Sequence, residues 1–126
     1  MSRVFYMNTI SPKVVFVGNA RSGKTTTIRS LFTNKATSKY VSTIGLELHV
    51  WGRYKIWDCA GKPDYLGLGS GYYYEANIVI VFNGGEAFRE PETWESEVRK
   101  IAPNAQVFHI SGSVKEKLQR VKEILA

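Results

Sequence analysis

Apolar positions along this chain fall into short unbroken runs and helical stripes that are separated by polar loops. Residues 14–17 and 78–82 are apolar runs of strand length and are rich in β-branched side chains, which is typical of strands buried on both faces. Apolar side chains recur at helical spacing along 24–32, 92–101 and 114–125. The pattern therefore predicts strands and amphipathic helices in alternation.

Two further strands are predicted as a hairpin in the middle of the chain. Residues 46–51 alternate apolar and polar side chains, Gly52-Arg53 is a tight-turn signal, and residues 54–58 run back. Residues 33–43, before the hairpin, are polar and turn-like. Four glycines between Gly61 and Tyr74 predict a mobile loop that contains one short helix.

The order of these elements indicates a three-layer α/β fold. Strands that alternate with helices build a mainly parallel sheet covered on both faces, to which the hairpin adds one antiparallel edge strand. A last strand at 105–110 continues the alternation. A length of 126 residues corresponds to one domain, in which residues 1–12 form a short lead. Ligands of such sheets bind at the carboxyl ends of the strands, so we expect the functional residues there.

Charge and cysteine content narrow the class of protein. The net charge is +6, and residues 1–63 hold 10 Lys/Arg against 2 Asp/Glu, whereas residues 64–126 hold 7 against 9. A basic first half suggests an anionic partner, such as a nucleotide phosphate, a nucleic acid or an acidic protein, or else a solvated basic face. The single cysteine, Cys59, excludes an internal disulfide and fits a reducing compartment. No apolar run of membrane-spanning length and no lipidation cysteine are found, so we expect no membrane anchor.

Residues 18–25 carry the strongest chemical signal. The sequence Gly-Asn-Ala-Arg-Ser-Gly-Lys-Thr matches the phosphate-loop pattern G-x-x-x-x-G-K-[ST], and it lies between a predicted strand and a predicted helix, as the pattern requires. Backbone N–H groups of such a loop surround the phosphates, Lys24 reaches the β- and γ-phosphate oxygens, and the Thr25 hydroxyl holds Mg²⁺. The residues predicted to bind the phosphates are Gly18, Asn19, Ala20, Arg21, Ser22, Gly23, Lys24, Thr25 and Thr26.

Asp58-Cys59-Ala60-Gly61 follows the second hairpin strand, at the edge where the phosphate loop is expected. Phosphate-loop proteins place a Mg²⁺-linked aspartate there, so Asp58 is predicted to hold the metal and Gly61 to offer an N–H to the γ-phosphate. Thr43 lies in the polar segment before the hairpin. It is predicted to complete the Mg²⁺ ligands when a γ-phosphate is present, which would order that segment as a switch.

These stretches together resemble the small GTPases and, within them, the Ran family. The resemblance covers roughly residues 13–101, and its matching stretches are KVVFVGNARSGKTT (13–26), KYVSTIGLELHV (39–50), YKIWDCAGKPDYLGLGSGYYYEANIVIVF (54–82) and TWESEVRKI (93–101). It implies binding of GTP or GDP with Mg²⁺, held by Thr25, Thr43 and Asp58. It also implies transport or regulatory partners of the Ran type, docking on residues 39–50 and 61–74.

The chain departs from the family pattern at two functional positions. The glutamine that orients the attacking water is replaced by Lys62, and a charged lysine accepts no hydrogen bond from water, so we expect slow GTP hydrolysis or none. The guanine motif N-K-x-D is absent. Ser111 and Gly112 instead resemble the later S-A-K region around the base. Either one strand and its helix are deleted between Ile101 and Gln106, or the usual fifth strand has lost its motif.

The sequence thus predicts a C-terminally trimmed, monomeric guanine-nucleotide switch of the cytoplasm or nucleus. Lys24 is the main catalytic candidate, and Lys62 is a second one that replaces the family's glutamine. Two alternatives stay open: a catalytically degenerate module that docks the partners of Ran, and a phosphate-loop protein with relaxed base choice that binds ATP as well. Nucleic acid is not an expected ligand, because a phosphate ligand already accounts for the basic half.

Overall fold

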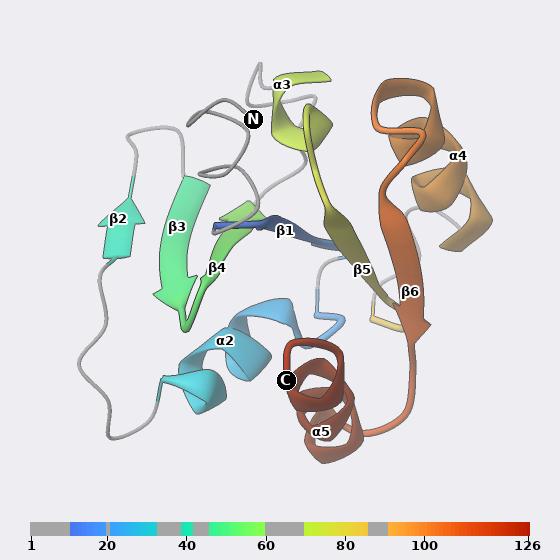
Figure 1. Cartoon of the computed structure of the whole chain (residues 1–126). Coiled ribbons are helices and arrows are strands. Elements are labelled where there is room, and N and C mark those ends of the chain that lie inside the picture. Colours follow the sequence, from blue (N-terminus) through green and yellow to red (C-terminus); the bar gives the residue numbers. More distant parts are fainter. Residues whose placement is uncertain (1–10, 20, 33–38, 42–45, 60–69, 86–90) are drawn as a thin grey trace.

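The computed structural model describes residues 11–19, 21–32, 39–41, 46–59, 70–85 and 91–126, apart from the side chains of residues 39–41, 59, 70 and 91. Strands and helices alternate along most of this chain (Figure 1). The elements are β1 (Lys13–Gly18), α2 (Lys24–Leu31), β2 (Lys39–Val41), β3 (Leu46–Trp51), β4 (Tyr54–Cys59), α3 (Ser70–Tyr73), β5 (Ile78–Phe82), α4 (Pro91–Ile101), β6 (Gln106–Ile110) and α5 (Val114–Ile124).

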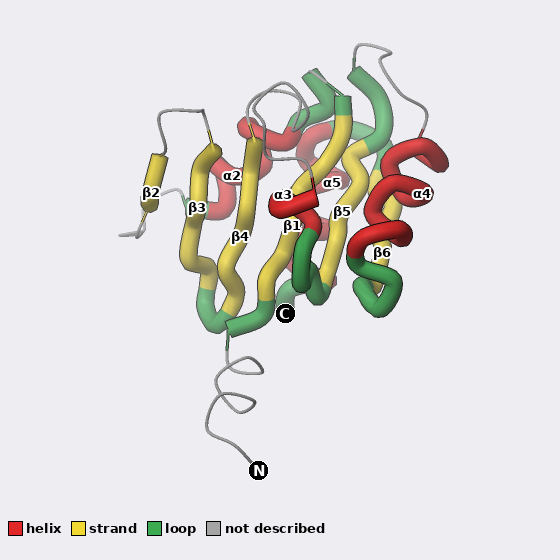
Figure 2. Tube along the Cα trace, turned by 90° about the horizontal axis from the view of Figure 1, so that it is seen from above, coloured by secondary structure: helices red, strands yellow, loops and turns green. Residues whose placement is uncertain are grey.

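The strands form one six-stranded sheet in the order β2-β3-β4-β1-β5-β6 (Figure 2). β1 lies in the middle and pairs in parallel with β4 and β5, and β5 pairs in parallel with β6. β3 is antiparallel to β4, and β2 is antiparallel to β3. The predicted three-layer, mostly parallel fold is confirmed.

One detail of the sheet differs from the prediction. The antiparallel hairpin strand β3 is not at the edge, because β2 pairs outside it through Lys39↔His49 and Val41↔Glu47. β2 was expected to be part of a turn-like polar segment. Its three residues carry no apolar pattern of their own and gain strand geometry only by pairing with β3.

Helices cover both faces of the sheet, which explains the unbroken apolar strands. α2 and α5 lie on one face, and α3 and α4 lie on the other (Figure 1). Val14 and Phe16 of β1 pack toward α2 and α5, whereas Val15 and Val17 pack toward α3 and α4, and all four are at most 2% exposed. Alternate side chains of a strand point to opposite faces, so a strand covered twice must be apolar throughout.

The last part of the chain runs from α4 through residues 102–105 to β6 and then to α5. β6 pairs directly with β5, and α5 packs against α2. A single strand therefore separates α4 from α5, whichever of the two predicted origins applies. The longest described helices, α4 and α5, have 11 residues each, and within the described ranges no helix is long and apolar enough to cross a membrane.

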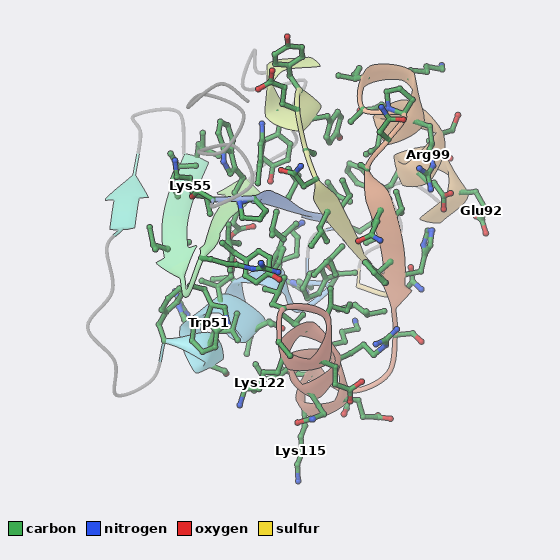
Figure 3. All side chains as sticks on the ribbon, viewed as in Figure 1. Trp51, Lys55, Glu92, Arg99, Lys115 and Lys122 are labelled. Carbon is green, nitrogen blue, oxygen red and sulfur yellow. The ribbon has the colours of Figure 1, made fainter. Side chains whose placement is uncertain are left out.

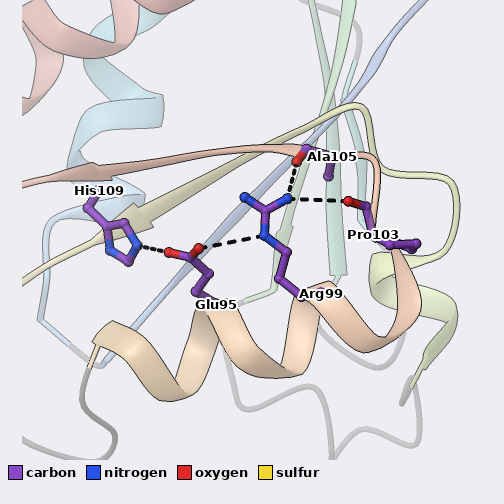
Figure 4. Close-up of polar contacts among 5 residues, drawn as sticks. All are labelled: Glu95, Arg99, Pro103, Ala105 and His109. Carbon is purple, nitrogen blue, oxygen red and sulfur yellow. Dashed lines mark hydrogen bonds and ion pairs between the residues drawn. The ribbon is translucent and has the colours of Figure 1, made fainter.

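A polar cluster fixes the packing of α4 against β6 (Figure 4). Glu95 lies with its carboxylate 2.5 Å from His109 Nε2 and 3.6 Å from Arg99 Nε. Arg99 also donates to the carbonyl oxygens of Pro103 and Ala105, at 3.4 and 2.7 Å. The cluster thus satisfies backbone carbonyls in the turn between helix and strand. It lies outside the predicted nucleotide site.

Candidate functional site

The phosphate loop leaves the carboxyl end of β1 and runs into α2. Gly18 has φ 151°, and a Cβ built on it would lie 2.6 Å from the Phe82 carbonyl oxygen and 2.9 Å from Ser22 Oγ. Gly23, the N-cap of α2, has φ 99°. Any larger residue at Gly18 would collide with β5, so the first glycine is required by close backbone approach. Ala20 lies outside the described residues.

A hollow of about 190 Å³ opens inside this loop. It is lined by Asn19 and by residues 21–26, so the structure brings the described part of the predicted phosphate site together. The N–H of Thr27 is bonded to Gly23 O at 2.9 Å, and Gly23, the N-cap, has no side chain that could cap the helix. The first N–H groups of α2 therefore face the loop with the positive end of the helix dipole, which is a favourable place for an anion.

Two basic residues of the loop differ in their placement. Lys24 is half-buried, and its ammonium donates to the Gly18 carbonyl at the other end of the loop. Arg21 is exposed and adopts a left-handed backbone conformation, with φ 63°. Lys24 therefore lies across the loop, where it can reach a phosphate, and Arg21 marks the turn of the loop.

Asp58 lies near the end of β4, next to β1 in the register Phe16↔Asp58. Its side chain is 3% exposed, and burial raises the pKa of its carboxyl to about 6, while the charge of Lys24 opposes the rise and that of Glu47 adds to it. Within the described part of the chain, Asp58 Oδ1 has no hydrogen-bond partner. A buried carboxylate oxygen without a partner fits a ligand that brings positive charge.

These residues fit Mg²⁺ by their donor chemistry. Mg²⁺ takes oxygen ligands, mostly one or two protein oxygens together with phosphate oxygens and water. Asp58 offers a carboxylate, and Thr25 offers an exposed hydroxyl on the first turn of α2. No three His, Cys, Asp or Glu side chains converge among the described residues. The third predicted ligand, Thr43, lies outside the described residues, as do Gly61 and Lys62.

The carboxyl ends of three strands are level with one another. Gly18 of β1 is in register with Phe82 of β5, which is in register with Ile110 of β6. Ser111 and Gly112 follow directly and so lie on the same edge as the phosphate loop. Gly112, with φ 97°, also has a structural role. A Cβ there would lie 2.9 Å from the carboxylate of Glu116, which closes the capping box of α5 with Ser113.

Two residues at the site were missed by the sequence reasoning. Lys117 is 5% exposed, and its ammonium donates to Ser22 O at 2.8 Å and to Asn83 O. Tyr72 was predicted only as part of the partner-docking range 61–74. Its buried hydroxyl lies 2.9 Å from the Phe16 carbonyl oxygen and 3.1 Å from that of Trp57. Lys117 lies outside the motifs, and nothing in the local sequence signals either contact.

A second hollow, of about 670 Å³, lies at the opposite end of the strands. Lys13 borders it, donating to the carbonyls of Gly71 and Tyr74 at 3.3 and 2.8 Å, and burial lowers the pKa of this lysine to about 8. The Lys13 ammonium also lies 3.7 Å from the centre of the Trp57 ring. None of the residues predicted to bind phosphate, base or metal lines this hollow.

Most of the chain matches the model of a known protein family. The family model described as Roc, the "Ras of Complex, Roc, domain of DAPkinase", matches residues 13–115. The match begins at the first residue of β1, includes the phosphate loop and Asp58, and ends in the first turn of α5. The match therefore covers most of the chain. It includes the described residues of the site at the carboxyl ends of the strands, except Glu116 and Lys117.

Proposed function

This chain belongs to the Roc family of Ras-like small GTPase domains, and from that premise we propose that it is a switch that binds GTP or GDP with Mg²⁺. The observation that carries the proposal is the juxtaposition of two features at one sheet edge. The loop hollow lies at the N-terminus of α2, and the buried Asp58 presents a carboxylate oxygen that has no hydrogen-bond partner among the described residues. One feature suits phosphate, and the other suits the cation that accompanies it.

Each residue of the site has a distinct part in this proposal. Backbone N–H groups of the loop bind the β-phosphate, and Lys24 exchanges its bond to the Gly18 carbonyl for phosphate oxygens. Thr25 and Asp58 hold Mg²⁺, with Thr43 added in the GTP state. When bound, Mg²⁺ neutralises the charge that develops on the phosphate oxygens. Gly61 donates to the γ-phosphate and so makes the segment after β4 sensitive to the nucleotide.

We propose that hydrolysis is weak. Lys24 stabilises the charge of the transferring phosphoryl group, but Lys62 stands where the family has a glutamine to orient water. A lysine at that position has no acceptor for a water proton while it is charged. The attack of water on the γ-phosphate therefore proceeds without that positioning, and nucleotide exchange rather than turnover sets the state of the switch.

The proposal also concerns which base the site selects and which proteins the switch binds. Ser111 and Gly112 lie at the edge where a base attached to loop-bound phosphates is expected, but no N-K-x-D motif supplies the acid that selects guanine. Relaxed base choice is the alternative that this absence favours. Ran-type transport or regulatory proteins remain our proposed partners, on residues 39–50 and 61–74, for a monomer of the cytoplasm or nucleus.

Calorimetric titration of nucleotide-stripped protein with GDP, GTP, ADP and ATP, each with Mg²⁺, tests the proposal. We expect guanine nucleotides to bind more tightly than adenine nucleotides. Equal affinities would refute guanine selection and leave the phosphate site in place. Absence of binding by all four would refute the nucleotide switch and favour the catalytically degenerate docking module.

A further inference from the structure

Lys117 joins three segments that are far apart in sequence. It lies in the first turns of α5, and its buried ammonium donates to the carbonyl oxygens of Ser22, 95 residues earlier, and of Asn83, 34 residues earlier. Ser22 belongs to the phosphate loop, and Asn83 directly follows β5. The Asn83 N–H is itself bonded to Ile110 O at 2.9 Å, so this anchor is fixed in the sheet.

In the described part of the chain, no carboxylate pairs with the ammonium of Lys117. Among the described residues its polar contacts are the two backbone carbonyls, and its burial lowers the pKa of the ammonium. Burying a charge without a carboxylate costs stability, and an apolar residue would fill the same volume at less cost. The contacts with the loop therefore point to a role in the site rather than in the stability of the core.

The geometry of the peptide unit shows what the contact with Ser22 does. In a trans peptide the carbonyl of one residue and the N–H of the next point in opposite directions. Lys117 holds the Ser22 carbonyl on the side of α5, so the N–H of Gly23 is directed to the other side of the loop. Gly23 is one of the residues that line the phosphate hollow.

The stem of Lys117 and the start of α5 support the same arrangement. A Cβ on Gly23 would lie 3.9 Å from Lys117 Cδ and 3.7 Å from Val114 Cγ2, so both side chains pack along the loop. The capping box fixes the first turn of α5: Ser113 Oγ accepts from Glu116 N–H at 3.1 Å, and Ser113 N–H donates to the Glu116 carboxylate at 2.9 Å. The capped first turn of α5 thus holds Lys117 in place beside the loop.

We propose that Lys117 is a positioning residue of the nucleotide site, which holds the outer, carbonyl side of the phosphate loop so that the Gly23 N–H faces the β-phosphate. The inference rests on the proposed function and deepens it. It assigns to α5 a direct part in phosphate affinity, although α5 begins about 90 residues after the phosphate-loop motif.

The test compares Lys117→Met, which keeps the stem and removes the ammonium, with Lys115→Met on the same helix. Lys115 is exposed and points away from the sheet into solvent (Figure 3). Two quantities are measured: the affinities for Mg²⁺-GDP and for GMP, and the hydrogen exchange of the amides of residues 22–24 in ligand-free protein. We expect Lys117→Met to weaken GDP binding by about tenfold to a hundredfold, the range of one charge-assisted hydrogen bond.

GMP has no β-phosphate, so its affinity should change less, and the preference for GDP over GMP should fall. Exchange at residues 22–24 should become faster, while Lys115→Met leaves both quantities at the wild-type values. Lys117→Gln, which keeps an N–H donor without the charge, should give an intermediate loss. This variant also provides the comparison if the methionine variant does not fold.

Three results bear on the proposal in separate ways. Unchanged GDP affinity and unchanged exchange in Lys117→Met would overturn it. A uniform increase of exchange along β6 and α5, with the GDP-to-GMP preference intact, would also overturn it and show a purely structural residue. If the wild type binds no nucleotide, the proposed function fails, yet exchange of the Gly23 amide still decides whether Lys117 holds the loop.

Discussion

Replacing Asp58 with asparagine should stabilise the nucleotide-free and metal-free protein while impairing its binding site. The Asp58 carboxyl is 3% exposed, and burial raises its pKa from 3.8 to about 6. The difference between these two pKa values corresponds to about 3 kcal/mol of cost for the ionised form at pH 7. Asparagine removes this cost but buries an amide, so we expect a net gain of about 1–2 kcal/mol.

The pH dependence fixes the sign of the effect. Unfolded chains lose the Asp58 proton near pH 3.8, whereas the folded protein keeps it until about pH 6. Between these values the unfolded state binds fewer protons, so the contribution of Asp58 to the free energy of unfolding falls as pH rises and then stays constant above about pH 6. Asp58→Asn should therefore be about 1–2 kcal/mol less stable than the wild type near pH 4, where only the cost of the buried amide remains, and more stable than the wild type at pH 7.

Urea unfolding at intervals from pH 4 to pH 8, with chelator present, measures this difference. Glu123→Gln is the matched control, since it makes the same chemical change at a carboxylate that is 54% exposed. A variant that is less stable than the wild type at pH 7, or a difference that does not change with pH, would refute the reasoning. The same variant should lose the Mg²⁺-dependent part of nucleotide affinity, because the metal loses its buried carboxylate.

Three further predictions concern other parts of the molecule. Lys62→Gln should raise single-turnover GTP hydrolysis by about tenfold or more, since glutamine can orient the water; an unchanged rate would show that another residue limits the reaction. Tyr72→Phe should lower the free energy of unfolding by about 1 kcal/mol through loss of its buried hydrogen bond, whereas Tyr74→Phe, 62% exposed, serves as a control without effect. Glu95→Gln should cost less than about 1 kcal/mol, because the carboxylate is 37% exposed. The hydrogen bond with His109 lowers the pKa of Glu95 below 4.5. The ionised Glu95 therefore stabilises the fold above pH 4.5, and this contribution disappears in acid. Equal stability of Glu95→Gln and the wild type at pH 6 would contradict this prediction.

The elements that the sequence predicts well are those with a strong local pattern. The apolar run before Gly18 predicts a strand, because a strand buried on both faces must be apolar throughout. The apolar stripe along α5 predicts a helix, because only one side of that helix is buried. β2 could not be predicted, since its three residues become a strand only by pairing with β3. The edge position of the hairpin was wrong for the same reason.

The site shows a similar division. The phosphate loop and Asp58 follow from motif and spacing, and the structure brings Lys24 close enough to influence the pKa of the aspartate. Lys117 could not be found in this way, because its contacts join residues 34 and 95 positions apart. Only the fold brings α5 to the loop. Gly112, predicted to lie near the base, proves to be required by a helix cap as well.

The central claim is that the hollow at the start of α2 holds the phosphates of a nucleotide, with Lys24 as its main side-chain contact. The most direct measurement is the equilibrium dissociation constant of Mg²⁺-GDP for the wild type and for Lys24→Met, in parallel with unfolding curves that establish that the variant is folded. Loss of one buried charge contact of about 3 kcal/mol predicts weakening by roughly a hundredfold. A wild type that binds no nucleotide, or a folded Lys24→Met that binds GDP as tightly as the wild type, would contradict the account.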